Sequence, residues 1–161
     1  MIVVSNTSPI VNLAVVGQLD MLRRLYGKVF IPQAVYDEIV VVGAGRAGAP
    51  EVKTAGWIEA RQARDRVLFT SLQLELDEGE SEAIALAAEL DADLLLLDER
   101  KARAIASRLG LRFIGLLGIL IEAKRAGLVP SVKPIMNELV HRAGFWIRED
   151  LYARVLQAAG E

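Results

Sequence analysis

Four oxygen-bearing side chains in the sequence have the types and positions of metal ligands: Asn6, Glu38, Glu80 and Asp98. Asn6 follows a short apolar run and Asp98 follows four consecutive leucines, so both come at the carboxyl ends of predicted strands, where open α/β sheets bind ligands. At about 100° of rotation per helical residue, Glu38 lies at the edge of the apolar stripe of its segment and Glu80 lies on the buried face of its helix. A buried acid is costly unless it is paired or binds a cation.

The donor set points to one class of ion and one class of reaction. Carboxylate and amide oxygens without His or Cys suit a hard cation, Mg²⁺ or Mn²⁺, whose remaining positions are filled by water and substrate phosphate. Phosphodiester hydrolysis uses such an ion, because the metal activates water and stabilises charge on the phosphate oxygens. On the same helical wheel Glu82 and Glu89 face solvent, so we expect Glu80 to be the acid from this helix.

Each of these residues also has a structural explanation that the sequence leaves open. Asp98 is a candidate N-cap for the helix that follows it, and Glu80 fits a capping box with the residue three positions before it. Glu38 is also compatible with an ordinary acid whose side chain reaches the surface. The segment after the first strand fits a simple helix start, with Ser8 as the N-cap and Pro9 as the first helical residue. The joint fit of all four positions to one site favours the metal hypothesis.

The composition limits the possible chemistry. The chain has 161 residues, of which 53% are hydrophobic and 25% charged, and this is the composition of one globular domain with a sizeable core. It has no Cys and a single His, so disulfide scaffolds, thiolate zinc sites, Cys nucleophiles and two-histidine mechanisms are excluded. The net charge is −2, from 19 basic and 21 acidic residues, so binding of a nucleic acid needs a local offset to the carboxylates, for which a divalent cation is the candidate.

The elements that position these residues alternate along the chain. Short apolar runs predict strands at 1–4, 28–31, 57–60, 94–97 and 111–114. Helical patterns lie between and after them, at 9–25 with a break near Gly17, and at 32–42, 65–76, 78–90, 99–109, 116–125, 131–142 and 150–159. Strands separated by helices form a parallel sheet covered on both faces, so we expect an α/β fold. Residues 1–161 form one domain in this prediction, with 130–161 as a C-terminal helical extension.

A glycine motif suggests a different function, dinucleotide binding, but the residues around it do not fit that function. Gly43, Gly45 and Gly48 form a literal G-x-G-x-x-G, the fingerprint of dinucleotide binding. That fingerprint must follow a strand, but the residues from Pro32 onward follow a helical stripe. The few residues between Pro50 and the next glycine are also too short for a crossover helix. We therefore expect a loop here and no dinucleotide cofactor.

Membrane association is not expected from the sequence. The longest apolar stretch, residues 113–121, falls far short of the roughly 20 residues that a spanning helix requires. The apolar N-terminus has no basic region and is interrupted by Asn6 and Asn12, which does not fit a signal peptide. We therefore expect a cytoplasmic protein.

The ordered set of segments resembles PIN-domain proteins, and more closely the VapC-type toxin ribonucleases, in a branch that opens with Ser-Asn/Asp-Thr-Ser-Pro. No single motif is specific, but the set covers nearly the whole chain in order. The matching segments are Val3-Val4-Ser5-Asn6-Thr7-Ser8-Pro9-Ile10, Ile31-Pro32-Gln33-Ala34-Val35-Tyr36-Asp37-Glu38, Gly79-Glu80-Ser81-Glu82-Ala83-Ile84-Ala85-Leu86-Ala87, Leu95-Leu96-Leu97-Asp98-Glu99-Arg100 and Gly115-Leu116-Leu117-Gly118.

The resemblance implies a three-layer α/β/α PIN-like fold and a Mg²⁺- or Mn²⁺-dependent endoribonuclease. It places Asn6 at the first-strand aspartate position and Ser8 at the neighbouring hydroxyl position, which orients a water or the phosphate. Glu38 matches the helix glutamate, Glu80 the third acid, with Glu82 of the same motif as the alternative, and Asp98 the fourth. The resemblance further implies the toxin of a toxin–antitoxin pair, which forms a homodimer and is blocked by a small antitoxin protein.

Asn6 departs from the family pattern, because an amide oxygen brings no negative charge to a cation. The alternative function is therefore a catalytically weakened or inactive PIN-fold module that binds RNA or protein. Arg100 and Arg103, on the helix that leaves the predicted site, are candidate contacts for RNA phosphates; the alternative is that both are ordinary solvated helix charges.

Overall fold

The centre of the molecule is a sheet of five parallel strands, seen in a computed structural model that describes all 161 residues. The strand order is β3-β2-β1-β4-β5, so β1 lies in the middle with β2 and β4 as its neighbours. Ser5 of β1 stands opposite Leu96 of β4, which aligns the carboxyl ends of these two strands. The strands are β1 (Val3–Ser5), β2 (Val29–Pro32), β3 (Ile58–Arg61), β4 (Leu94–Leu96) and β5 (Phe113–Ile114).

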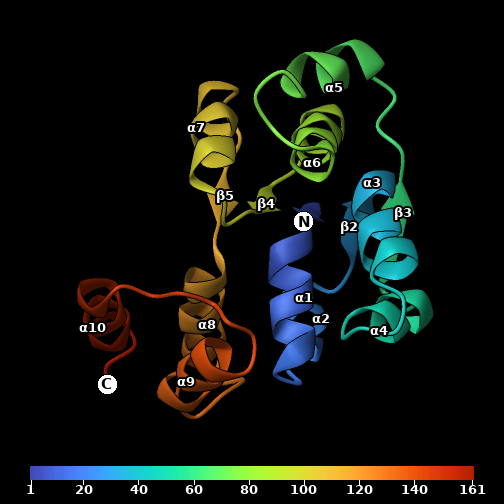
Figure 1. The fold of residues 1–161 in the computed structure, drawn as a ribbon. Helices are drawn as coiled ribbons and strands as arrows, with labels where there is room; N and C mark the ends of the chain where they lie inside the picture. Colours follow the sequence, from blue (N-terminus) through green and yellow to red (C-terminus); the bar gives the residue numbers. More distant parts are fainter.

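Helices cover both faces of this sheet (Figure 1). On one face lie α5 (Arg66–Leu72), α6 (Glu78–Glu89) and α7 (Arg100–Arg108). The other face carries α1 (Thr7–Val15), α2 (Asp20–Tyr26), α8 (Leu116–Arg125), α9 (Lys133–His141) and α10 (Glu149–Ala158). The segment after β2 forms α3 (Gln33–Tyr36), the π-helix η1 (Asp37–Val42) and α4 (Ala49–Thr54). The fold is therefore the predicted three-layer α/β/α arrangement.

The leucine strand shows how the sequence produces two cores. Leu94 and Leu96 pack into the apolar cluster beneath the sheet, and Leu95 and Leu97 pack into the cluster on the α6 side. Side chains alternate between faces along a strand, so a continuous apolar run fits only a strand that is covered on both faces. All four leucines are buried, as the sequence predicts.

The C-terminal helices join the larger of these cores. Met136 and Leu139 of α9 and Val155 of α10 are buried in the same cluster as β1. The Glu161 carboxylate accepts a hydrogen bond of 2.7 Å from the backbone N of Val132, which closes the end of α10 onto the start of α9.

The helix predicted at 32–42 changes its geometry halfway. Its second half is the π-helix η1, in which the N–H of Gly43 donates to the carbonyl of Glu38, five residues earlier, at 2.9 Å. A Cβ on Gly43 would lie 2.6 Å from the carbonyl oxygen of Ile39, so only glycine fits this end. Residues 43–48 form turns, as predicted for a loop, but the helix α4 follows directly at Ala49, where the sequence predicts no helix before the next strand.

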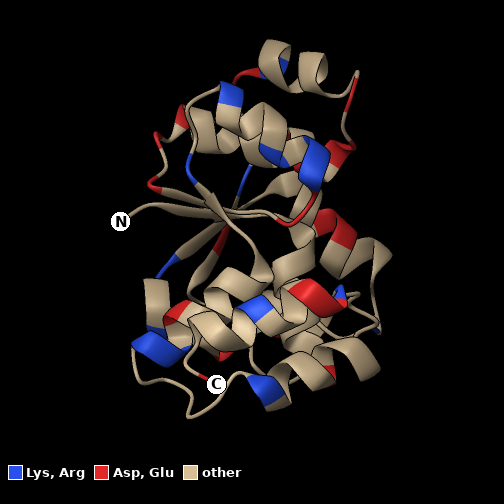
Figure 2. Ribbon diagram, turned by 90° about the vertical axis from the view of Figure 1, so that its left-hand side faces the viewer, with Lys and Arg blue, Asp and Glu red and all other residues tan.

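Charge is unevenly placed around the sheet. Figure 2 shows several acidic segments at the edge of the sheet opposite the N-terminus, toward which the parallel strands run. No helix of the structure is both long enough and apolar enough to cross a membrane.

Candidate active site

The two central strands create a crevice where the chain reverses its direction of winding. From β1 the chain continues to β2 on one side, whereas β4 lies on the other side of β1. Such a switch point leaves a gap at the carboxyl ends of the strands, where α/β proteins bind ligands. Asn6 directly follows β1, and its N–H donates to the carbonyl of Leu96 at 3.0 Å. Asp98 follows the end of β4 by two residues, so both side chains stand at this crevice.

A cavity of about 380 Å³ opens at this point. Its wall has one apolar residue, Val11, and the rest is polar or acidic. The five residues that the sequence predicts as site residues all line it: Asn6, Ser8, Glu38, Glu80 and Asp98. Thr7, Asn12, Asp77 and Glu99 complete the wall. Segments of the chain up to 92 residues apart, from Asn6 to Asp98, therefore meet in one acidic cavity.

Asn6 and Glu38 converge on the first turn of α6. Asn6 occupies the N-cap position of α1, but its side chain makes no capping hydrogen bond and is left for the cavity. A Cβ placed on Gly79 would lie 3.1 Å from Oε2 of Glu38 and 3.5 Å from Oδ1 of Asn6. The missing side chain at residue 79 thus leaves a small space beside two oxygens from different elements.

Glu38 is exposed, and the prediction that it lies on a half-buried face is wrong. The physical reason is local, because η1 is π-helical and a wheel of 100° per residue does not describe it. Its Oε2 accepts a hydrogen bond of 2.6 Å from the hydroxyl of Thr7, the residue after Asn6. Thr7 therefore fixes the direction of the Glu38 carboxylate toward the cavity.

Glu80 combines the predicted capping box with a place in the cavity wall. Its N–H donates to Asp77 Oδ1 at 2.8 Å, and its Oε1 accepts from the N–H of Asp77 at 3.2 Å. Burial raises the pKa of Glu80 to about 7, and the neighbouring charges of Asp77 and Glu99 add to the rise. The group therefore exchanges its proton near neutral pH, which is typical of acids in functional sites.

Asp98 does not cap the helix that follows it, so this alternative explanation is wrong. Glu99 is the N-cap of α7, and Asp98 Oδ1 instead accepts a hydrogen bond of 2.8 Å from the N–H of Leu116, the first residue of α8. Its Oδ2 is buried without a hydrogen-bond partner. Burial raises the pKa of Asp98, while the Leu116 N–H, the charge of Arg103 and a hydrogen bond from the Ser8 hydroxyl act against that rise. A buried carboxylate oxygen without a donor from the protein is uncommon, and this oxygen is open to a water or a cation.

Ser8 is a cavity residue and not the predicted N-cap. The helix begins one residue earlier, at Thr7, so Ser8 and Pro9 are its second and third residues. Pro is tolerated in this first turn because its missing N–H has no partner there. Ser8 Oγ accepts a hydrogen bond of 2.9 Å from the side-chain amide of Asn12, one turn further along α1. Its hydroxyl group lies beside the Asp98 carboxylate, and a hydrogen bond from Ser8 lowers the pKa of that acid.

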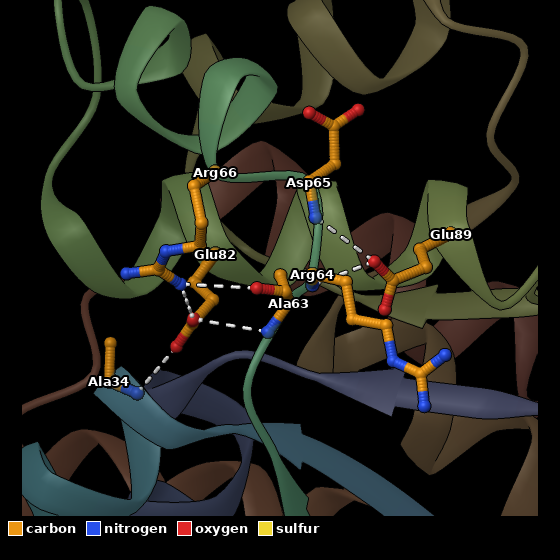
Figure 3. A network of polar contacts seen from close by, with 7 residues as sticks. All are labelled: Ala34, Ala63, Arg64, Asp65, Arg66, Glu82 and Glu89. Atoms are coloured by element: carbon orange, nitrogen blue, oxygen red, sulfur yellow. Dashed lines mark hydrogen bonds and ion pairs between the residues drawn. The ribbon is translucent and has the colours of Figure 1, made fainter.

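Glu82 is 2% exposed, so the prediction that it faces solvent is wrong. It accepts hydrogen bonds from the backbone N of Ala34 at 2.7 Å, from the backbone N of Ala63 at 3.2 Å and from Arg66 Nη1 at 2.7 Å (Figure 3). These four residues, which we call the Glu82 cluster, hold the loop before α5 and the start of α3 against α6. Glu82 does not line the cavity.

The prediction that Glu89 faces solvent is correct. This residue lies two positions beyond Ala87, the last buried residue of α6, and is exposed. Its Oε1 accepts hydrogen bonds from the backbone N of Arg64 at 2.7 Å and of Asp65 at 3.1 Å (Figure 3).

The residues of the cavity fit a hard cation by their chemistry. The donors are carboxylate and amide oxygens, Asp98 Oδ2 has no partner, and the space beside Gly79 adjoins two further oxygens. No three acidic or His side chains come close enough together to surround one ion. Mg²⁺ is commonly held by only one or two carboxylates, with water in its other positions, so this open arrangement suits it.

Five residues of the cavity wall were not among the predicted site residues: Thr7, Val11, Asn12, Asp77 and Glu99. Thr7 orients Glu38, and Asn12 donates to Ser8. The spacing of Asn12, four residues after Ser8 on one helix, is the signal that predicts such a contact. The partner of Thr7 lies 31 residues away and had no local signal.

The chain matches the sequence model of the PIN domain over residues 2–161. No curated protein matches the chain with significant similarity. The match spans nearly the whole chain and includes every residue of the cavity wall.

Proposed function

The chain belongs to the PIN-domain family, whose members are generally nucleases that use divalent metal ions, and from this premise we propose that it is a Mg²⁺- or Mn²⁺-dependent endoribonuclease. The observation that carries the proposal is the acidic cavity at the switch point, where Asp98 presents a buried oxygen without a donor. An acidic cavity repels a phosphodiester unless a cation lies between them, so substrate and ion belong together in this proposal.

In this proposal Asn6, Glu38, Glu80 and Asp98 hold the ion together, one or two of the carboxylates directly and the others through water, since no three acids surround one point. Asp98 contributes Oδ2, because the Leu116 N–H occupies Oδ1. Asn6 and Glu38 contribute the oxygens beside Gly79. When bound, the metal would supply Lewis-acid chemistry, which lowers the pKa of water and offsets charge on phosphate oxygens.

Ser8 has a separate role in the proposal. Its oxygen accepts from Asn12 and its hydroxyl stands beside the proposed ligand Asp98, where it would orient a phosphate oxygen or an attacking water. Ser8 would thus orient the substrate while the acids bind the cation. Glu80 binds the ion in its ionised form, which a pKa of about 7 makes available from neutral pH upward.

We also propose that the protein is the toxin of a toxin–antitoxin pair, acts as a homodimer and is blocked by a small antitoxin protein. The support is the resemblance of its ordered segments to VapC-type ribonucleases. Induced expression in a bacterial host would then arrest growth, and Asp98→Asn would remove the arrest. Arrest that persists in that variant would count against a toxin that acts through this cavity.

The test of the nuclease is cleavage of a structured RNA pool by the purified protein with Mg²⁺, Mn²⁺ or EDTA. We expect metal-dependent cuts that EDTA abolishes. Asp98→Asn should slow cleavage by at least about 100-fold, because it removes a charged ligand of the ion. Cleavage that is equal in EDTA, or equal in the variant, would refute the proposed site.

A second candidate function is a PIN-fold module that binds RNA or protein with little or no catalysis. Asn6 in place of an aspartate favours it, because one ligand charge is missing from the cavity. Retained metal binding without cleavage of any RNA would support this second function over the first.

A further inference from the structure

Arg103 of α7 is folded back onto the chain at the point where Asp98 leaves the sheet. Its Nε donates to the carbonyl oxygen of Leu97 at 2.7 Å, and its Nη2 lies 3.9 Å from Oδ1 of Asp98. The guanidinium also lies over the ring of Phe113, 5.3 Å from the ring centre. Three separate contacts therefore determine where this head group lies, and its side chain is 33% exposed.

These contacts act on Asp98 from two sides. Leu97 directly precedes Asp98, and its N–H donates to the carbonyl of Ile114 at 2.9 Å while its carbonyl accepts from Arg103. Leu97, the residue before Asp98, is thus fixed at both of its backbone polar groups. The Oδ1 atom of Asp98 is occupied by the Leu116 N–H, with Arg103 beside it. Oδ2 is the oxygen that remains without a donor.

Gly115 makes the approach of Arg103 possible. A Cβ at this position would lie 1.9 Å from Nη2 of Arg103 and 2.8 Å from Oδ1 of Asp98. The backbone of Gly115 has φ −95° and ψ 177°, which any residue adopts, so the need for glycine here is spatial. The space that a side chain would fill is used by the guanidinium.

We propose that Arg103 is a positioning residue that holds Asp98 with Oδ2 available for the cation, and that it is not a contact for RNA phosphates. This inference rests on the proposed metal-dependent function of the cavity. The planar guanidinium suits the task, because it donates to a carbonyl, stacks on a ring and faces a carboxylate in one rigid geometry. A lysine ammonium at the end of a flexible chain would not make all three contacts.

A positioning residue and a phosphate contact predict different experimental results. Loss of a positioning residue that supports a metal ligand weakens metal binding by about 10- to 100-fold. Loss of a phosphate contact raises the KM for RNA and reduces the salt dependence of binding by about one unit of slope. The experiment therefore measures Mn²⁺ affinity by calorimetry, and kcat, KM and salt slope for RNA, in Arg103→Ala and Arg103→Lys. Arg108→Ala is the matched control, because Arg108 is exposed on the same helix and does not line the cavity.

We expect Arg103→Ala to weaken Mn²⁺ binding by about 10- to 100-fold and to lower kcat, with KM and salt slope unchanged. Arg103→Lys should recover part of the Mn²⁺ affinity. Unchanged Mn²⁺ affinity in Arg103→Ala, or a raised KM with a smaller salt slope, would overturn the inference. Wild-type protein that binds Mn²⁺ but cleaves no RNA would refute the nuclease alone, and the Mn²⁺ affinities would still decide the role of Arg103. Wild-type protein that binds no Mn²⁺ would refute both.

Gly115→Ala provides a second variant if Arg103→Ala folds poorly. It keeps the arginine but places a methyl group in the space of its head group and 2.8 Å from Asp98 Oδ1, so it should weaken Mn²⁺ binding by disturbing the same pair. Gly56→Ala is its control, since a Cβ there meets nothing within 4 Å. Equal Mn²⁺ affinity in the two glycine variants would contradict the inference.

Discussion

Two acids on one helix, Glu80 and Glu82, lie in environments that differ in how their oxygens are used. In the Glu82 cluster both carboxylate oxygens accept hydrogen bonds, from two backbone N–H groups and one arginine. In the cavity, Glu80 has one contact of 3.2 Å through Oε1, and Asp98 has an oxygen with no donor at all. A carboxylate whose oxygens are all occupied holds the structure together, whereas one with free oxygens in a cavity is available to a ligand.

The difference also shows that the burial of an acid on a helix is, by itself, a poor guide to its function. Glu82 is much more buried than Glu80, yet its donors are all internal and connect α6 with the start of α3 and the loop before α5. The cavity acids, by contrast, come from separate elements and face a common space. The following predictions separate the two regions by changing one at a time.

The largest effect on stability is expected in the Glu82 cluster. Glu82→Ala leaves the N–H groups of Ala34 and Ala63 without acceptors, which should lower the free energy of unfolding by about 2–4 kcal/mol. Urea unfolding measures this loss. Glu89→Ala is the matched control, because Glu89 also accepts from two backbone N–H groups but is exposed, and it should cost less than about 1 kcal/mol. Equal losses in both variants would contradict the structural role of the buried carboxylate.

In the cavity, the addition of a charge should strengthen metal binding. Asn6→Asp supplies the negative charge that the amide lacks, and we expect Mn²⁺ affinity to rise by about tenfold, since ligand charge sets affinity at such sites. Without metal the same variant should be less stable, because it adds a carboxylate beside Glu38 and Asp98. Calorimetric titration and thermal melts in EDTA measure both effects. An unchanged affinity would remove Asn6 from the set of ligands.

Glu80 makes the ion-free protein sensitive to pH. Its pKa is raised from the ordinary value of 4.5 to about 7, so the folded protein holds a proton that the unfolded chain releases between these values. Stability in EDTA should therefore fall as pH rises from about 4.5 through 7, and Glu80→Gln should flatten that fall. Urea unfolding at pH 5 and pH 8 tests this. A divalent ion should restore stability at pH 8 in the wild type, and stability that rises across this range would show that burial does not govern Glu80.

The smallest effect is expected at Gly79. Gly79→Ala places a methyl group 3.1 Å from Glu38 Oε2 and should weaken Mn²⁺ binding by about fivefold, close to 1 kcal/mol. Alanine favours a helix over glycine, so the melting temperature should stay constant or rise. A lower melting temperature together with unchanged Mn²⁺ affinity would show that the gap serves packing and not the ion.

Much of the fold was predictable because it depends on local patterns. The four leucines at 94–97 predict a strand buried on both faces, and Asp77 with Glu80 predicts the start of α6. The positions of Asn6 and Asp98 after strands β1 and β4 predict that both reach the same edge of the sheet. Each of these predictions uses residues that are close together in the sequence, or the rule that the carboxyl ends of parallel strands meet at one edge of the sheet.

The remaining features depend on contacts between distant segments. Glu82 is buried because the loop at residues 63–66 covers its side of α6. A helical-wheel analysis assumes one buried face and one exposed face, so it fails for a helix that is buried on nearly every side. The exposure of Glu38 follows from the π-helical turn, which the apolar spacing did not reveal. The position of Arg103 depends on the space left by Gly115, twelve residues later and on another element.

The most direct test of the contrast is a Mn²⁺ titration of three proteins, the wild type, Asp98→Asn and Glu82→Gln, under conditions in which all three are folded. The account predicts that the wild type and Glu82→Gln bind Mn²⁺ with similar affinity, while Asp98→Asn loses most of its binding. Loss of binding in Glu82→Gln, together with unchanged binding in Asp98→Asn, would contradict it and move the metal site away from the cavity.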